Sequence, residues 1–376
     1  MRKFNLVVVK KLLIILLLVS CLSCHKEQVS EGLTLLRLPE GVNVMQQGAK
    51  GDGLTDDTPA FEKAMRVADS LKVPVIIPTG KYKANIKISY DHLSLLGKQQ
   101  PSEKFEFGTI IMGSINCNNK KNITIQYLGI DARDNPVAAA LTSGDGADSS
   151  ELNQTFNHIS LLGGGYHDFN HGILCQTGRS ILIKNIIVKN FYHGIAIRSG
   201  KVKVDSIEAI SCGFTSVIVK SAENKNCRTS EVAVNHVTVK GNPANPFERG
   251  GTILIQSYEN NSLTENIYIG NITSYDAGVS AVAIDESKGN VRNVLIENCI
   301  AYYQGDDPSR ACFEVYGGSE VTFKNCSSIQ ARGTGFRCAG SVQKVRAEHC
   351  YESGSGMRAW WGNFSYLQLN GVEIIK

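Results

Sequence analysis

Apolar and polar residues alternate with a period of two through most of this chain. From about residue 171 the alternating stretches belong to a unit that recurs every 20 to 36 residues. Each unit opens on a glycine followed by alternating apolar residues, as in 194–197 and 251–255. It continues into a second alternating segment that ends on a small polar residue, as in 291–298. Because an α-helical repeat would space its apolar residues by 3.6, the pattern predicts a solenoid of short parallel β-strands.

The polar residues that end these segments form a column. A tight corner between two short strands needs a residue that tolerates the left-handed conformation, and asparagine does so better than most residues. Stacked amides can also hydrogen-bond from coil to coil, so we interpret the column as structural. Three of its members are followed directly by cysteine, which predicts an inward column of Cys299, Cys326 and Cys350. The polar column comprises Asn185, Asp205, Asn235, Asn271, Asn298, Asn325, His349 and Asn370.

Residues 48–65 have the features of a loop that leads into a capping helix. Pro59 suits a first helical turn, with Thr58 or Asp57 as its cap. An apolar helical face follows, and 75–82 then indicates strand, turn and strand. We expect Asp52, Asp56 and Asp57 to shape the turn and cap the helix rather than to catalyse. Such a helix would cover the apolar end of the first coil.

This stretch resembles the N-terminal cap of the pectate-lyase-like superfamily, which contains pectate and rhamnogalacturonan lyases, polygalacturonases and alginate epimerases. The resemblance covers about residues 43–83. It implies an all-β fold, a single-stranded right-handed parallel β-helix with an N-terminal capping helix, and a uronate-rich glycan as substrate. It leaves the reaction open, because one fold hosts several. The NTD and RIK motifs of polygalacturonases and the epimerase Asp-Pro-His-Asp signature are missing, so no catalytic residue is assigned by motif.

The first twenty residues have the pattern of a secretory signal. Four basic residues precede an apolar run, Leu12 to Val19, which is much shorter than the roughly 20 residues of a spanning helix. The run ends in Leu18-Val19-Ser20-Cys21, which resembles a bacterial lipobox, with Cys24 as a second candidate. We therefore predict a lipoprotein signal peptide at 1–20, a tether at 21–42 and a β-helix domain at 43–376. The protein is expected to be exported and anchored by a lipid on Cys21 to the outer membrane or cell surface.

Charge and cysteine content exclude two classes of function. The net charge of +4 equals the four basic residues of the signal, so the mature chain is near neutral and lacks the basic surplus of a nucleic-acid binder. A polysaccharide and a monomeric state are expected instead. The cysteines beyond Cys24 are odd in number and none has CxxC spacing, which favours buried thiols over a zinc site. They are positions 117, 175, 212, 227, 299, 312, 326, 338 and 350.

Candidate site residues come from the register of the glycine-initiated strands. Residues between the apolar positions should point outward, where the superfamily binds its substrate. The column expected at the strand ends is Arg198, Lys220, Gln256, Asp285, Tyr316, Ala339 and Trp360. The column two residues earlier is Ala196, Ile218, Leu254, Ala283, Glu314, Arg337 and Arg358.

These columns supply the chemistry of a polysaccharide lyase. β-Elimination from a uronate needs a cation for the carboxylate, a base for the C5 proton and a proton for the leaving oxygen. Arg198 suits the carboxylate, and Lys220, beside a cation that lowers its pKa, suits the base. Tyr316 is the candidate acid. Gln256, Arg337, Arg358 and Trp360 are expected to bind substrate.

Two other readings stay open. Asp285 and Glu314 should lie roughly 8 Å apart, within the range of an inverting glycoside hydrolase. Alternatively, Trp360, Trp361 and Tyr316 could form the platform of a non-catalytic glycan-binding protein.

His171 and His193, each before Gly-Ile, should stack beside Arg198 as further catalytic candidates. Calcium assists many pectate lyases, and the one weak candidate for holding it is Asp306-Asp307 in the 301–310 loop.

Overall fold

A computed structural model describes residues 41–376 with gaps at 118, 135–137, 145–149, 166–169, 177, 222–227, 242–251, 258–261, 277, 287–289, 305–309 and 376. Residues 41–376 form one compact unit. The predicted signal peptide, most of the tether, and Cys21 and Cys24 lie outside the described residues. In the part that is described, no helix is both long enough and apolar enough to cross a membrane.

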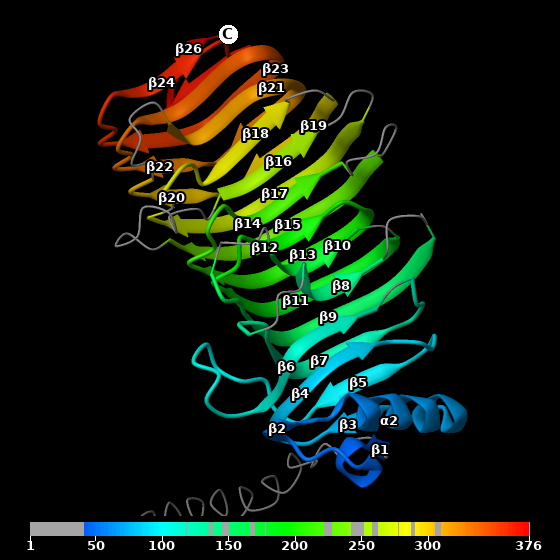
Figure 1. Ribbon diagram of the computed structural model, residues 1–376. Coiled ribbons are helices and arrows are strands. Elements are labelled where there is room, and N and C mark those ends of the chain that lie inside the picture. The colour runs from blue at the N-terminus through cyan, green and yellow to red at the C-terminus, as the bar shows by residue number, and fades with distance from the viewer. Residues whose placement is uncertain are drawn as a thin grey trace, which may run out of the picture. The chain divides into compact units, whose positions relative to one another are not determined.

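The chain forms a right-handed parallel β-helix, and its strands stack from α2 at one end to β26 at the other (Figure 1). Strands in successive coils pair in parallel, so each coil hydrogen-bonds the next. The first coils contain β1 (Val42–Asn43), the 3₁₀-helix η1 (Val44–Gln47), β2 (Asp52–Asp56), α2 (Thr58–Leu71), β3 (Val75–Ile77), β4 (Gly80–Lys87), β5 (Ser94–Gly97), β6 (Thr109–Asn116) and β7 (Thr124–Asp131).

The remaining coils have three faces, and face A consists of strands in register from coil to coil. They are β8 (Ala139–Ser143), β10 (His171–Cys175), β12 (His193–Ile197), β14 (Thr215–Lys220), β16 (Thr252–Ser257), β18 (Val282–Glu286), the first parts of β21 (Ala311–Lys324) and β23 (Thr334–Ser353), and β24 (Arg358–Gly362).

Faces B and C follow face A in each coil and are mostly formed by single bent strands. These are β9 (Glu151–Leu162), β11 (Arg179–Lys189), β13 (Gly200–Ile210), β15 (Arg228–Lys240) and β17 (Leu263–Tyr275). Later coils use β19 (Asn290–Glu297), β20 (Ile300–Tyr302), β22 (Ser327–Ile329), the later parts of β21 and β23, and β25 (Tyr366–Leu369). The last strand, β26 (Val372–Ile375), pairs antiparallel to β25.

A continuous apolar core fills the interior of the coils. The inward positions of each strand supply it, for example Ile195, Ile197 and Phe336. At the N-terminal end the buried face of α2, with Phe61 and Met65, packs on this core. The helix therefore covers an apolar coil end, as the sequence predicted.

The N-terminal aspartates hold the entry loop. Asp57 is buried and its carboxylate accepts the backbone N–H groups of Lys50 and Gly51, at 2.6 and 3.1 Å. Asp52 accepts the N–H groups of Leu54 and Thr55, which lower the pKa of its exposed carboxyl to about 2. The expected cap is corrected in one respect. Asp57 stands at the N-cap position, but its side chain bonds the preceding loop and not the helix N–H groups.

The corner between faces B and C is a single left-handed residue. The φ angle is 54° at Asn185, 55° at Asn298 and 52° at Asn325, and Asn325 Nδ2 donates to Asn298 Oδ1 at 3.2 Å. In two coils the left-handed residues are Ser206 and His236. The corners predicted at Asp205 and Asn235 were therefore wrong by one residue. Asp205 pairs with Lys184, so the residue opposite the Asn185 corner is Ser206.

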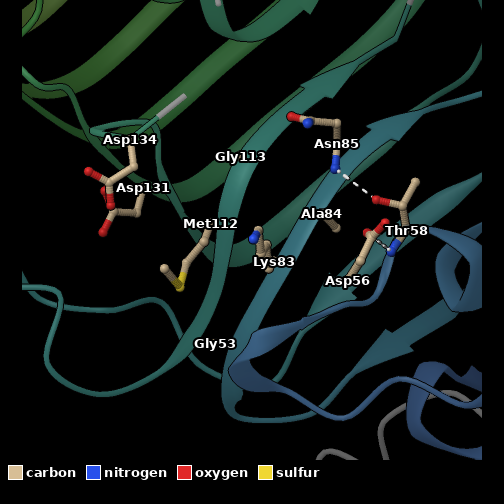
Figure 2. Close-up of a pocket in the computed structure, with 10 residues that line it drawn as sticks. All are labelled: Gly53, Asp56, Thr58, Lys83, Ala84, Asn85, Met112, Gly113, Asp131 and Asp134. Atoms are coloured by element: carbon tan, nitrogen blue, oxygen red, sulfur yellow. Dashed lines mark hydrogen bonds between the residues drawn. The ribbon is translucent and has the colours of Figure 1, made fainter. Parts of the chain in front are cut away.

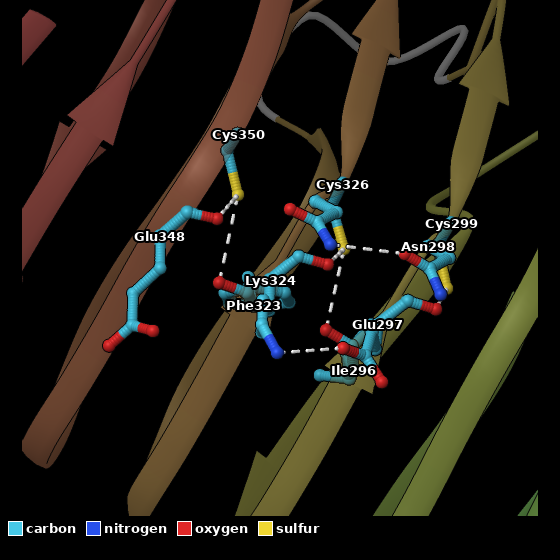
Figure 3. A network of polar contacts seen from close by, with 10 residues as sticks. Ile296, Glu297, Asn298, Cys299, Phe323, Lys324, Cys326, Glu348 and Cys350 are labelled. Atoms are coloured by element: carbon cyan, nitrogen blue, oxygen red, sulfur yellow. Dashed lines mark hydrogen bonds and ion pairs between the residues drawn. The ribbon is translucent and has the colours of Figure 1, made fainter. Parts of the chain in front are cut away.

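The predicted cysteine column lies directly behind these corners (Figure 3). Cys326 Sγ donates to the carbonyl oxygen of Ile296 at 3.5 Å, and Cys350 Sγ donates to that of Phe323 at 3.7 Å. All eight described cysteines are buried free thiols. Burial raises the pKa of Cys175 to about 12 and that of Cys326 well above its ordinary value. These thiols are small core residues, as the sequence predicted; Cys227 lies outside the described residues.

Candidate functional site

The outer side of face A carries the predicted column of polar side chains. Lys220 pairs with Gln256, and Gln256 pairs with Asp285. The pairing of Ile197 with Val219 places Arg198 beside Lys220, and that of Ile284 with Val315 places Asp285 beside Tyr316. Gln256 Nε2 donates to Asp285 Oδ2 at 3.0 Å. The predicted register is therefore confirmed from Arg198 to Tyr316.

The predicted register is wrong in the last coil. Trp360 pairs with Phe336 and packs against the core, so it is not an outward residue. Arg358 pairs with Thr334, and the residue that pairs with Arg337 is Trp361. The final coil lacks the Gly-apolar pattern that marks the earlier ones, so its register could not be aligned with theirs. Trp361, which the sequence suggested only as part of a glycan-binding platform, therefore takes the outward position expected of Arg358.

The second outward column is apolar and buried for five coils. Its members are Leu174, Ala196, Ile218, Leu254 and Ala283, which form a cluster of their own with Ala139, separate from the interior core. Lys220 next to them is only 8% exposed. The strands of face A are thus buried on both sides in these coils, where the second outward column forms an apolar floor with polar groups along it.

His171 and His193 stack at the start of this face, as predicted. Their ring centroids are 4.9 Å apart. His193 Nδ1 lies 2.6 Å from Thr215 Oγ1, and Thr215 continues the same column in the next coil. Burial lowers the pKa of His193 to about 2, and the neighbouring His171, Lys220 and Arg198 add to this effect. The His193 imidazole is therefore neutral and lies beside Arg198 and Lys220.

This neutral imidazole makes the fold sensitive to acid. The unfolded chain takes up a proton near pH 6.5 and the folded protein does not, so stability is lost as pH falls below about 6.5. Between pH 7.5 and pH 5 we expect His193 to contribute about 2 kcal/mol of this loss. Denaturant unfolding of His193→Gln should show an acid loss smaller by that amount. An equal loss in both proteins would mean that folded His193 takes up the proton.

A second polar group occupies the other end of face A. Glu314 is fully buried and ion-paired with Arg310, with Arg310 Nε and Glu314 Oε1 3.3 Å apart. The same oxygen accepts the N–H of Ala311 at 2.9 Å and the hydroxyl of Ser280. Sequence reasoning did not identify Arg310 or Ser280, since both precede their strands and lie outside the alternating pattern.

Tyr316 and Arg337 lie directly beside this ion pair. Arg337 Nη1 donates to the Tyr316 hydroxyl at 2.9 Å. Burial raises the pKa of Tyr316 to about 12, and a hydrogen bond to Glu314 acts in the same direction. The Tyr316 hydroxyl is therefore a poor proton donor at neutral pH and part of a structural hydrogen-bond network.

A pocket of about 490 Å³ near the N-terminal cap is an alternative location (Figure 2). Two of the three carboxylates that line it, those of Asp56 and Asp131, are used in local structure. Asp56 accepts the N–H of Thr58 at 3.0 Å, and Asp131 is ion-paired with Arg133 at 2.7 Å. Within the described ranges no three His, Cys, Asp or Glu side chains group as a metal site. The calcium candidate Asp306-Asp307 lies outside those ranges.

Comparison with known proteins gives a family match and one curated relative. The model of the family described as rhamnogalacturonase A/epimerase, pectate lyase-like, matches residues 41–241. Depolymerase 1, capsule KN3-specific, of Klebsiella phage KN3-1 is 29% identical over 171 residues. The aligned region is 44% of this chain and 20% of the phage protein, so the chain spans a fifth of that relative's length.

Two solved structures resemble the chain over most of its length. The A-module of mannuronan C-5 epimerase AlgE4 from Azotobacter vinelandii has a TM-score of 0.54 and 13% identity, covering 86% of this chain and 98% of the module. The enzymatically active domain of bacteriophage CBA120 tailspike protein 2 has a TM-score of 0.52 and 12% identity, covering 82% and 43%. At these identities the likeness establishes the parallel β-helix fold alone.

Proposed function

Since this chain belongs to the rhamnogalacturonase A/epimerase family of pectate-lyase-like proteins, we propose that it cleaves a uronate-containing polysaccharide by β-elimination on face A. The family and the phage depolymerase support a carbohydrate-active enzyme. One observation carries the choice of reaction: Arg198 and Lys220 are neighbours across β12 and β14, beside the neutral His193 and above the apolar floor.

This arrangement divides the elimination between two side chains. The Arg198 guanidinium binds the uronate carboxylate, which disperses the charge that develops when C5 loses its proton. Lys220, which is 8% exposed and lies next to Arg198, is the amine that serves as the base. Its Nζ takes the C5 proton, the C4–oxygen bond breaks and a C4–C5 double bond forms. The resulting ammonium then delivers that proton to the leaving oxygen.

Tyr316 does not fit the acid role that the sequence suggested. Between Lys220 and Tyr316 lie Gln256 and Asp285, so three coil spacings of roughly 4.8 Å, or about 14 Å, separate the two residues. One glycosidic bond cannot contact both side chains. The Tyr316 hydroxyl is also held by Arg337. We therefore give Lys220 both proton transfers and assign Tyr316 to binding.

The hydrolase alternative depends on Asp285 and Glu314. Asp285 is half-buried and bonded to Gln256. Glu314 is fully buried, ion-paired with Arg310, and bonded through Oε1 to Ser280 and Ala311. A general base must reach a water next to the sugar ring, and a carboxylate held beneath the surface does not. The arrangement thus favours the lyase over a hydrolase that uses this pair.

The proposal is tested by the product that forms from uronate polysaccharides. A lyase leaves an unsaturated sugar at the new non-reducing end, seen by its ultraviolet absorbance, with one double bond for each new reducing end. We expect that ratio with at least one substrate of a panel of polygalacturonate, rhamnogalacturonan and alginate. New reducing ends without the double bond would indicate a hydrolase, and binding without either signal would indicate a glycan-binding protein.

We also place this activity outside the cytoplasm. The signal peptide predicted at 1–20 and lipid attachment at Cys21 would hold a monomeric enzyme at the membrane surface, where extracellular polysaccharide reaches face A. Calcium is left out of the reaction steps, because its candidate ligands Asp306 and Asp307 belong to the part of the chain that the structure does not describe.

A further inference from the structure

Cationic and aromatic side chains alternate in a stack at the C-terminal end of face A. The Arg310 guanidinium lies 5.3 Å from the Tyr316 ring centroid. Arg337 lies 4.9 Å from the same ring and 4.8 Å from the ring of Trp361. We call these four residues the Arg337 stack. It begins where the apolar floor of face A ends, since Glu314 and Arg337 follow Ala283 in the same outward column.

The stack is held from beneath by the buried carboxylate of Glu314. Its ion pair fixes Arg310, and Arg310 covers one side of the Tyr316 ring. Tyr316 in turn accepts a hydrogen bond from Arg337. Trp361 completes the stack and is 40% exposed, whereas the floor residues are at most 7% exposed. The contacts therefore lead from the buried Glu314 carboxylate, through Arg310, Tyr316 and Arg337, to the solvent-exposed ring of Trp361.

We infer that the Arg337 stack is a distal subsite that binds a second uronate residue of the polysaccharide. This inference rests on the proposed function. With rings lying against Arg337 on two sides, the N–H groups along the guanidinium edge are its bonding groups, and a carboxylate matches that edge. The exposed Trp361 ring offers an apolar surface to the C–H face of the same sugar. The expected ligand is thus an anionic sugar residue within a polysaccharide.

The position of the stack sets a minimum substrate length. Lys220 is on β14 and Arg337 is on β23, with β16, β18 and β21 as the intervening steps along face A. Four spacings of roughly 4.8 Å place the two residues about 19 Å apart. A uronate disaccharide cannot bridge that span, and a longer oligosaccharide that follows the column of polar residues on face A can. The affinity for oligosaccharides should therefore rise once they are long enough to reach the Arg337 stack.

The test measures binding apart from turnover. Calorimetric titrations use Lys220→Ala as the parent, with oligogalacturonates and, separately, oligomannuronates from the dimer to the octamer. Arg337→Gln and Trp361→Ala are each added to this parent. In whichever oligosaccharide series binds the parent, we expect each added substitution to weaken octamer binding at least about tenfold, the size of a lost charge-assisted hydrogen bond or stacking contact. Binding of the dimer should be unchanged.

A matched arginine on another face serves as the control. Arg346 lies 4.7 Å from the Tyr366 ring on face B, and Arg346→Gln should leave binding of every length unchanged. Octamer binding that is insensitive to both stack variants, at unchanged melting temperature, would overturn the subsite. Equal weakening of dimer and octamer would also overturn it. Failure of both series to bind the parent, together with absent elimination by the wild type, would instead reject the proposed function on which it rests.

Discussion

Replacing Lys220 by alanine should lower turnover of the active uronate substrate at least about a hundredfold, the usual scale for a positioned acid–base group. The same loss is expected for Arg198→Ala, because the carboxylate then keeps its full negative charge as C5 is deprotonated. Lys220→Arg keeps a long basic side chain, but the guanidinium stays protonated and cannot act as a base, so this variant should be as inactive as the alanine variant. Initial rates of double-bond formation measure all three.

The controls separate chemistry from folding and from the hydrolase. Lys203 is an exposed lysine on face B of the neighbouring strand β13, and Lys203→Ala should retain wild-type rates. Asp285→Asn should lose little activity in a lyase and most of it in a hydrolase that uses Asp285. Wild-type rates in Lys220→Ala and Arg198→Ala, with elimination still observed, would place the active centre elsewhere, with His171 and His193 as the next residues to change.

Glu314→Ala should destabilise the protein by about 3 to 5 kcal/mol, which is the scale for removing one partner of a buried ion pair. The loss leaves Arg310 without its carboxylate and leaves the Ser280 hydroxyl and the Ala311 N–H without an acceptor. Chemical denaturation and melting temperature are the measurements. Glu320 forms a comparable ion pair with Lys344 at 3.0 Å, but on the surface, so Glu320→Ala should change stability little.

Glu314→Gln distinguishes this structural role from a catalytic one. Glutamine keeps an acceptor for Ser280 and Ala311 but removes the charge, so a smaller loss of stability is expected. The folded fraction should keep its elimination rate on short oligosaccharides, which do not reach the Arg337 stack. Complete loss of turnover at an unchanged melting temperature would contradict the structural role and would support Glu314 as a hydrolase carboxylate.

The fold could be predicted from the sequence because its determinants are local. Alternation of period two gives the strands, and a left-handed residue gives the corner between faces B and C. The loop and helix at 48–71 give the covered end. The two shifted corner residues, Ser206 and His236, show the limit of this reasoning. Serine has no strong signature for left-handed backbone, and His236 directly follows Asn235, which tolerates that conformation as well, so the pattern did not distinguish the two neighbours.

The candidate site was only partly predictable for a physical reason. Alternation separates inward from outward residues, and this was enough to align Arg198, Lys220, Gln256 and Asp285. It does not reveal whether an outward residue is solvated. Ile218 and Leu254 therefore became an unexpected apolar floor, and Glu314 became a buried ion-pair partner. The pairing of Trp361 with Arg337 was not predicted, because the final coil has no glycine-initiated strand to fix its register.

The corners of each coil differ in how much length they tolerate. From β7 onward the turn between faces B and C is one residue, whereas the connection from face A to face B ranges from 198–199 to 221–227 and that from face C to face A from 190–192 to 241–251. In these coils insertions are thus confined to the two rims of face A, while the opposite edge keeps the coils in register; the coil before them carries residues 98–108 between faces B and C. Exchanging rim segments between related proteins should therefore change which glycan is accepted without rebuilding the scaffold, which makes this face a natural place for specificities to diverge.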